Sequence, residues 1–220
     1  MSDAYYNVVH AIGSAIFWGS ARPLVLHAER TSRSGPFIVA SNHHSPFDVP
    51  LLIRHSRRHL DFVSIVEVFK HPFVSWFYGS MNAFPIDRSQ PDSAGVRTIL
   101  ERLERGRAVA MFPEGVIRKP PSSVTHGGRF RPGVARLAQM AGVPVMPCVV
   151  VNSGLYSRVS AWVPVRRIRY GVIFGEPLLL HTELDKAAAV SAMEAELKDA
   201  FVRLYGELTA KMQEKKMAIV

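Results

Sequence analysis

The sequence predicts an α/β fold: a single domain with a mainly parallel or mixed central sheet flanked by helices, plus an N-terminal amphipathic helix. Short apolar runs of strand length alternate along the chain with segments whose apolar residues recur every three or four positions, which is typical of strands alternating with helices. The chain has 220 residues, 48% of them hydrophobic and 20% charged, so it is long enough to bury a core and too apolar to be disordered. No repeat or linker divides it, and we assign residues 1–22 to the helix and 23–220 to one domain.

The predicted N-terminal helix contains 18 consecutive uncharged residues, Ala4–Ala21, which is the length at which a membrane span must be considered. Asn7, His10 and Ser14 are spaced by three and four, so they form a narrow polar stripe on an otherwise apolar helix. This pattern favours a helix lying in the membrane interface over a full span. Docking on the protein's own core is the alternative. The N-terminus lacks the basic region of a secretory signal peptide.

The remaining elements follow from the spacing of apolar residues. Strands are expected where apolar residues run together or alternate with polar ones, and helices where they share one face. The predicted strands are 37–40, 61–66, 84–86, 108–112, 143–151 and 168–174. The predicted helices are 68–78, 93–105, 134–141 and 187–217, the last being one helix or a pair. On the helix 93–105, we expect Arg102 and Arg105 to point into solvent.

The charge balance points to an anionic partner. Lys and Arg number 27 and Asp and Glu 18, a formal charge of +9, which suits an anionic membrane face, a phosphorylated substrate or nucleic acid. A nucleic-acid-binding domain would interleave aromatic and basic residues on one face, whereas the arginines here follow strands. The single cysteine, Cys148, excludes an internal disulfide and zinc sites with two or more thiolates. Its place in an apolar strand predicts an inert core thiol.

The densest group of chemically active residues is 42–48, which follows a predicted strand and precedes a helical pattern. Ser45 and Pro46 suit the N-cap and the first position of a helix, which places Asp48 in the first turn, where a negative charge is favoured. A bend before the cap would bring His43 to Asp48. A carboxylate bonded to one ring nitrogen fixes the tautomer and leaves the other nitrogen as a base.

Two other interpretations of this segment remain open. Ser45 and Asp48 could serve only to start the helix, in which case His43 would be a solvated loop histidine. A metal site could form from His43, His44 and Asp48. We disfavour the metal site because adjacent histidines on a loop rarely face one ion and no other ligand cluster supports it.

Further polar residues follow two more predicted strands. Arg88 comes directly after the strand 84–86, and Glu114, Gly115 and Arg118 come after the strand 108–112. Arg131 lies in a basic loop before a predicted helix. Ligands collect at the carboxyl ends of strands in open α/β sheets, and the guanidinium fork matches phosphate. These residues therefore predict a phosphate-binding site, with a solvated basic surface as the alternative.

Four segments occur in an order that resembles the glycerolipid acyltransferase family, whose best-known members are bacterial 1-acyl-glycerol-3-phosphate acyltransferases. They are Asn42-His43 with Ser45 and Asp48, Phe84-Pro85-Ile86-Asp87-Arg88, Phe112-Pro113-Glu114-Gly115 followed by Phe130-Arg131-Pro132-Gly133, and Val143-Pro144 with Pro147. The resemblance covers roughly residues 35–180. The third segment departs from the family's Phe-Pro-Glu-Gly-Thr-Arg, because Val116 and Ile117 replace the threonine and Arg118 comes one position late. This difference bears on the acceptor more than on the chemistry.

The resemblance implies that residues 23–220 form an acyltransferase domain. Such an enzyme moves a fatty acyl group from acyl-CoA or acyl-carrier protein to the free hydroxyl of 1-acyl-glycerol-3-phosphate, giving phosphatidic acid. It implies His43 as general base and Asp48 as the residue that orients it, with no metal and no cofactor beyond the acyl donor. Backbone N–H groups at the helix start after Ser45 are the expected oxyanion donors. The implied substrate-binding residues are Asn42, Ser45, Arg88, Glu114, Gly115, Arg118 and Arg131.

Other functions stay open at this point. The same chemistry could act on a lyso-ornithine lipid, glycerol-3-phosphate or another lysophospholipid. A non-catalytic membrane-bound relative and a basic nucleic-acid-binding domain are the alternatives from other classes. The expected partners are a lysophospholipid acceptor, acyl-carrier protein or acyl-CoA, and an anionic membrane surface, but no nucleic acid. We expect a peripheral or monotopic protein on the cytoplasmic face of the cell membrane.

Overall fold

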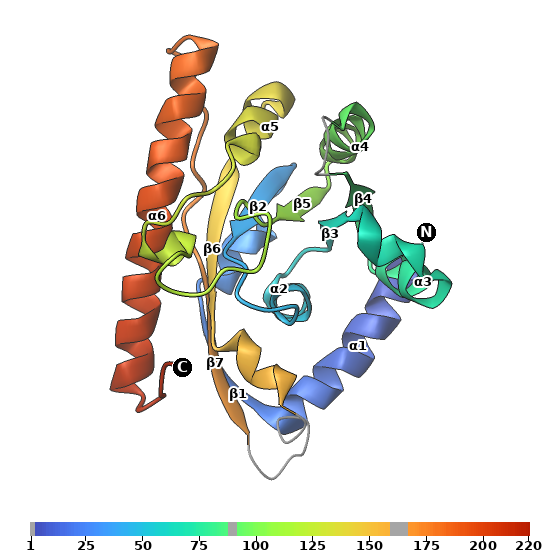
Figure 1. The fold of residues 1–220 in the computed structure, drawn as a ribbon, viewed down its shortest axis with the longest axis vertical. Helices are drawn as coiled ribbons and strands as arrows, with labels where there is room; N and C mark the ends of the chain where they lie inside the picture. The colour runs from blue at the N-terminus through green and yellow to red at the C-terminus, as the bar shows by residue number, and fades with distance from the viewer. Residues whose placement is uncertain (1–2, 88–91, 159–166) are drawn as a thin grey trace.

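A mixed seven-stranded sheet lies at the centre of the computed structural model (Figure 1), which describes residues 3–87, 92–158 and 167–220. The strand order is β1-β7-β6-β2-β5-β3-β4. The strands from β6 to β4 in this order are parallel, whereas β7 runs antiparallel to β6, and β1 is parallel to β7. The predicted α/β fold with a mixed sheet is confirmed. The strands are β1 (Ala21–Leu26), β2 (Phe37–Ser41), β3 (Leu60–Ile65), β4 (Phe84–Ile86), β5 (Ala108–Met111), β6 (Val145–Val151) and β7 (Ile168–Phe174).

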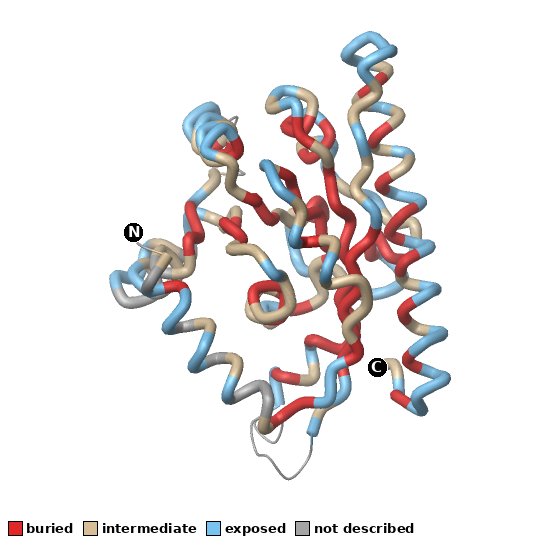
Figure 2. The backbone as a smooth tube through the Cα atoms, turned by 180° about the vertical axis from the view of Figure 1, so that it is seen from behind, coloured by how far each residue is buried: buried red, intermediate tan, exposed pale blue. Residues whose placement is uncertain are grey.

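Helices cover both faces of the sheet. One core cluster joins α4, α5 and α6 to the strands, with Ile99, Leu137 and Phe201 among its buried side chains. The cluster on the opposite face contains Leu51 of α2 and Tyr6 of α1. Figure 2 shows the buried residues concentrated along the strands and on the inward sides of the helices. The helices are α1 (Asp3–Ser20), α2 (Asp48–His55), α3 (Pro72–Ser80), α4 (Ser93–Glu104), α5 (Gly133–Ala141) and α6 (Lys186–Glu214).

The strand β6 is buried along its whole length, because a strand in the middle of a sheet with helices on both sides is covered on both faces. This explains its unbroken apolar sequence. Cys148 lies within β6 and is fully buried, and burial raises the pKa of its thiol. The expected inert core thiol is confirmed, since a protonated buried thiol is a poor nucleophile.

The N-terminal region differs from the prediction in one respect. The helix α1 ends at Ser20, and the next residues form β1, which pairs with β7 at the edge of the sheet. This strand was not predicted, because Arg22 and Pro23 interrupt its apolar pattern. Arg22 and Pro23 are exposed at the sheet edge, where a missing backbone N–H is tolerated. The predicted boundary between residues 22 and 23 therefore falls inside β1.

The helix α1 contacts the rest of the protein through the Asn7 side chain and the Ser14 backbone. The Asn7 Oδ1 atom accepts a hydrogen bond from His59 Nε2 (2.8 Å), and the Ser14 carbonyl accepts one from Arg54. Val8 and Ile12 are instead 54% and 59% exposed, so apolar side chains of α1 face outward. None of the helices in the described part of the chain is long and apolar enough to cross a bilayer.

The prediction that Arg102 points into solvent is wrong. Its Nη1 atom donates to Oδ2 of the buried Asp61 at 2.6 Å, and its guanidinium lies over the ring of Phe84, 4.6 Å from the centroid. A buried carboxylate must be paired, and Asp61 of β3 is brought under α4 by the sheet, which the helical spacing of Arg102 does not reveal. Arg105 is exposed, as predicted.

Candidate active site

The carboxyl ends of β2, β5 and β6 bring the predicted site residues together. Since β2 lies between β5 and β6 in the sheet, the loops that follow these strands meet at one edge, where open α/β sheets bind ligands. Asn42 fastens the loop after β2 to β6: its Nδ2 donates to the Val150 carbonyl (2.9 Å) and its Oδ1 accepts from the Val150 N–H (2.7 Å). The side chain is fully buried. Buried and bonded to Val150 at both polar ends, Asn42 positions the loop.

His43 and Asp48 form the pair that the sequence suggests. The His43 Nδ1 and Asp48 Oδ2 atoms are 3.0 Å apart, and the same oxygen accepts the backbone N–H groups of His44 (2.7 Å) and Ser45 (2.9 Å). The Asp48 side chain is fully buried, whereas that of His43 is 18% exposed. An ionised carboxylate can only accept hydrogen bonds, so Nδ1 carries the proton and Nε2 keeps a lone pair. No described residue forms a hydrogen bond with Nε2.

The start of α2 differs from the prediction. The helix begins at Asp48, so Ser45 is not its N-cap. Ser45 Oγ accepts the Phe47 N–H (3.1 Å) and donates to Ser153 Oγ (3.1 Å), and the Asp48 N–H donates to the Ser45 carbonyl (3.2 Å). In this segment the N–H groups of His44 and Ser45 thus bond to Asp48, and those of Phe47 and Asp48 bond to Ser45. The N-cap prediction was wrong because Pro46 and Phe47 form a turn before the helix, in which Ser45 accepts the Phe47 and Asp48 N–H groups.

Phe112 and Glu114, from the loop after β5, hold His43 from the other side. The His43 ring stacks on Phe112 with centroids 4.1 Å apart and an angle of 17° between the rings. Glu114 Oε2 accepts the His43 N–H at 2.6 Å, and its Oε1 accepts the Val124 N–H at 2.8 Å. Burial raises the pKa of Glu114. Because both carboxylate oxygens bind backbone, Glu114 fixes the position of the His43 loop.

A tight turn at Gly115 brings Arg131 against this loop. The Gly115 N–H donates to the Phe112 carbonyl (2.9 Å) with a φ of +69°, a conformation that favours glycine. A Cβ atom at this position would lie 3.2 Å from Arg131 Nε. The Arg131 N–H donates to the Pro113 carbonyl (2.8 Å). Gly115 therefore admits the exposed Arg131 side chain to the edge of the site.

Arg118 joins the loop after β5 to the loop after β2. Its N–H donates to the His43 carbonyl at 2.8 Å. Its Nε atom is buried and has no hydrogen-bond partner among the described residues, so it can donate to a ligand. Val116 and Ile117, just before it, are each 46% exposed. Arg88, which was predicted to bind the same ligand, lies outside the described residues.

His44 and Ser123 complete the loop and were not predicted as a pair. His44 Nε2 and Ser123 Oγ are 2.9 Å apart, and burial lowers the pKa of His44, so its ring is neutral at pH 7. The rings of His43 and His44 therefore bind different partners. In residues 3–87, 92–158 and 167–220 no group of three or more His, Cys, Asp or Glu is placed to hold a metal ion. No spacing in the sequence links residue 44 to residue 123, whereas Phe112 could be suspected from its place in the Phe-Pro-Glu-Gly segment.

Comparison with curated proteins gives relatives with named activities. The chain is 29% identical over 125 residues to the chloroplastic 1-acyl-sn-glycerol-3-phosphate acyltransferase of Brassica napus, and this alignment covers 56% of this chain and 35% of that protein. It is 24% identical over 155 residues to the 1-acyl-sn-glycerol-3-phosphate acyltransferase of Bacillus subtilis (70% and 72%). It is 30% identical over 132 residues to the lyso-ornithine lipid O-acyltransferase of Pseudomonas aeruginosa (60% and 49%). The chain thus matches about a third to three quarters of the length of these relatives.

Comparison with solved structures and family models agrees with the fold. The structure resembles the crystal structure of the 1-acyl-sn-glycerophosphate acyltransferase PlsC from Thermotoga maritima, with a TM-score of 0.70, 23% identity and coverage of 93% of this chain and 80% of that one. This likeness supports the fold. The model of the Acyltransferase family matches residues 23–151, more than half of the chain, and includes β2, β5, β6 and the loops that hold His43 and Asp48. The chain therefore belongs to the Acyltransferase family.

Proposed function

We propose that this chain transfers a fatty acyl group from acyl-CoA or acyl-carrier protein to the free hydroxyl of 1-acyl-glycerol-3-phosphate, giving phosphatidic acid. One observation carries the proposal: a buried carboxylate at the start of α2 binds Nδ1 of a partly exposed histidine, whose Nε2 has no partner among the described residues. Such a histidine can accept a proton from an alcohol. The names of the matched relatives from Brassica napus and Bacillus subtilis support this acceptor.

In the proposed reaction, His43 Nε2 removes the proton of the acceptor hydroxyl as its oxygen attacks the thioester carbonyl carbon. A tetrahedral intermediate forms, the carbon–sulfur bond breaks, and the thiolate takes the proton back from His43. Asp48 stabilises the imidazolium that exists between these two proton transfers. A thiol leaving group has a pKa of about 8.5, so no strong acid is needed, and His43 completes the cycle without a covalent enzyme intermediate.

The acceptor phosphate is proposed to bind beside His43. Arg118 contributes the buried Nε donor that has no partner among the described residues, and Arg131 contributes an exposed guanidinium next to Gly115. Arg88 is proposed for the same cluster on the strength of its sequence motif. Glu114 positions the His43 backbone rather than the substrate.

The lipid substrates are proposed to reach the site from an anionic membrane surface. Val8 and Ile12 of α1 expose apolar side chains, which suits a helix lying in the membrane interface. The net charge of +9 would attract anionic lipids of the cytoplasmic leaflet. We therefore propose a peripheral or monotopic protein on that face.

A lyso-ornithine lipid is the second candidate acceptor. The relative from Pseudomonas aeruginosa that carries this name is 30% identical over 60% of this chain. In addition, Val116 and Ile117 place two exposed apolar side chains directly before Arg118, where the family motif has a threonine. An acceptor without a phosphate would need Arg118 less.

The acceptor is tested with the purified full-length protein, a labelled acyl donor and separate lysolipids, with the product identified by mass. We expect 1-acyl-glycerol-3-phosphate to be acylated, and Arg118→Ala to raise its KM about tenfold or more, because a charge-assisted hydrogen bond to phosphate is lost. Arg203→Ala, an exposed position on α6, is the control. Acylation of the lyso-ornithine lipid alone, with a KM unchanged by Arg118→Ala, would establish the second candidate instead.

A further inference from the structure

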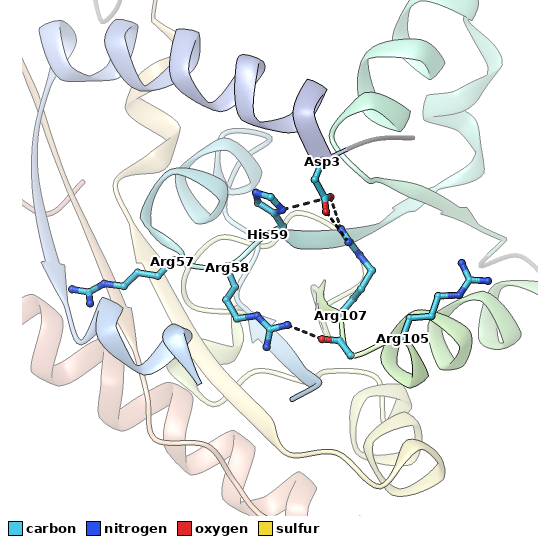
Figure 3. A pocket seen from close by; sticks show the side chains of 7 residues that line it. Asp3, Arg57, Arg58, His59, Arg105 and Arg107 are labelled. Atoms are coloured by element: carbon cyan, nitrogen blue, oxygen red, sulfur yellow. Dashed lines mark hydrogen bonds and ion pairs between the residues drawn. The ribbon is translucent and has the colours of Figure 1, made fainter. Parts of the chain in front are cut away.

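A second cluster of arginines lies at the other edge of the sheet, away from His43. It lines a pocket of about 410 Å³ formed by Asp3, Arg57, Arg58, His59, Arg105, Gly106 and Arg107 (Figure 3). Residues 57–59 come just before β3, and residues 105–107 come just before β5. Since β3 and β5 are parallel neighbours, these residues meet at the amino ends of the strands. The pocket is therefore separate from the catalytic loops, which follow the carboxyl ends.

Arg58 is held rigidly but lacks a carboxylate partner. Its guanidinium donates to the backbone carbonyls of Arg33 (3.0 Å), Gly35 and Gly106 (2.6 Å) and lies 5.5 Å from the centroid of the Phe37 ring. Burial and the charge of Arg107 lower its pKa, which is the signature of a cation without compensation. An anion in the pocket would supply that compensation.

Arg107 is fixed by two carboxylates, Asp61 and Asp3, which stabilise its charge. Its Nε and Nη2 atoms donate to the two oxygens of Asp61, each at 2.6 Å, but Asp61 also binds Arg102. Arg107 Nη2 also reaches Asp3 Oδ1 at 3.2 Å, and His59 Nδ1 lies 3.5 Å from the same oxygen. Asp3 is thus an internal carboxylate in a pocket whose other lining charges are all positive.

Arg57 and Arg105 flank the pocket. Both are exposed, and neither side chain forms a hydrogen bond or ion pair with any described residue. Figure 3 shows them at opposite ends, pointing away from each other, with Arg58, Asp3 and Arg107 between them. Four arginines against one aspartate give the lining a formal charge of +3 with His59 neutral, which matches a doubly charged anion better than a single carboxylate.

We propose that this pocket is a second phosphate-binding site, in which Arg58 and Arg107 are fixed donors and Arg57 and Arg105 add positive charge at its two ends. Planar guanidinium groups in fixed positions bind phosphate oxygens bidentately, and the volume suits a small ligand or a headgroup. The phosphate would compete with Asp3 for Arg107. Because Asp3 is the first residue of α1, occupancy would also change how the start of this helix is held.

The phosphate can belong to a soluble molecule or to a lipid headgroup, and both sources are tested. In the first arm, inorganic phosphate is titrated into the isotopically labelled full-length protein, and the backbone amides of His59 and Gly106 are followed by NMR. In the second arm, sedimentation is measured with phosphatidylcholine vesicles with and without phosphatidylglycerol. The variant Arg57→Ala/Arg105→Ala removes two side chains without described partners, so it should fold. Arg136→Ala/Arg203→Ala removes the same charge from exposed positions on α5 and α6.

We expect Arg57→Ala/Arg105→Ala to weaken binding roughly tenfold in at least one arm, because each exposed charge pair contributes a factor of about three. The arm that responds identifies the source. Asp3→Asn should strengthen binding of inorganic phosphate, since it removes the competing carboxylate. Equal binding by the wild type, the pocket variant and the charge-matched control in both arms would overturn the proposal. Neither arm measures acyl transfer, so the result is independent of the proposed catalytic function.

Discussion

Replacing Asp48 by asparagine removes the negative charge that faces His43 while keeping the shape of the side chain. In the proposed reaction, His43 becomes an imidazolium, and its Nδ1 lies 3.0 Å from Asp48 Oδ2. Two opposite unit charges at this separation attract each other by about 5.5 kcal/mol at an effective dielectric constant of about 20. Desolvation offsets part of this attraction, so it is an upper limit for the stabilisation of the charged intermediate. At about 1.4 kcal/mol for each factor of ten, the limit corresponds to about 10⁴-fold in rate.

We therefore expect Asp48→Asn to lower kcat by about 10²–10⁴-fold, the lower figure being the usual minimum for general-base assistance. The amide oxygen can still accept the N–H groups of His44 and Ser45, but as a neutral group. The loss of charge assistance should cost about 1–2 kcal/mol of stability, or a few degrees in Tm for a domain of this size. KM for the acceptor should change little, because Asp48 is buried and touches no substrate.

The assay is acyl transfer at saturating acceptor, well below the melting temperature of the variant. Asp185→Asn is the matched control: Asp185 is an exposed N-cap of α6 whose carboxylate accepts two backbone N–H groups, so it loses a similar local charge far from the site. A folded Asp48→Asn protein whose kcat lies within about threefold of the wild type would refute the assigned role of Asp48.

Three further predictions concern folding and membrane contact. Glu114→Gln places an amide N–H₂ against one of the two backbone N–H groups that Glu114 accepts, and it should lower the free energy of unfolding by about 1–3 kcal/mol. Because burial raises the pKa of Glu114 above 4.5, the wild type should lose stability as pH rises through that raised value. Denaturation at several pH values should show this loss in the wild type and not in Glu114→Gln. Burial lowers the pKa of His55 from 6.5 to about 3, so on acidification this histidine is protonated first in the unfolded state. The free energy of unfolding of the wild type should therefore fall by about 2 kcal/mol between neutral pH and about pH 5. A His55→Gln protein with the same acid sensitivity would be inconsistent with this. The double variant Val8→Asp/Ile12→Asp should reduce binding to vesicles, whereas Val202→Asp, at an exposed position on α6, should not. Equal pelleting of the wild type and both variants with vesicles would show that α1 does not contact the membrane.

The sequence predicted most of the elements because their apolar residues follow the period of a strand or a helix. The direction of β7 could not be predicted, since a long wholly buried strand such as β6 reads the same beside a parallel or an antiparallel neighbour. The edge strand β1 was not predicted because Arg22 and Pro23, which are exposed there, interrupt its apolar pattern.

Within the site, short sequence separations were more informative than types of residue. His43 and Asp48 are five positions apart, so one bend could join them, and the structure places them 3.0 Å apart. The roles of Asn42 and Glu114 as positioning residues depend on Val150 and Val124, which come from other loops and strands. Such partners follow from the order of strands in the sheet, which a single sequence does not specify.

In the proposed reaction, everything depends on the His43 imidazole removing the proton of the acceptor hydroxyl. The most direct test is the single-turnover rate of acyl transfer by purified His43→Ala, with His181→Ala, whose ring contacts Glu183 and Glu196, as the folding and purification control. We expect His43→Ala to lose at least about 10²-fold in rate while its Tm and acceptor binding stay close to those of the wild type. A rate within a few-fold of the wild type in the folded variant would contradict it.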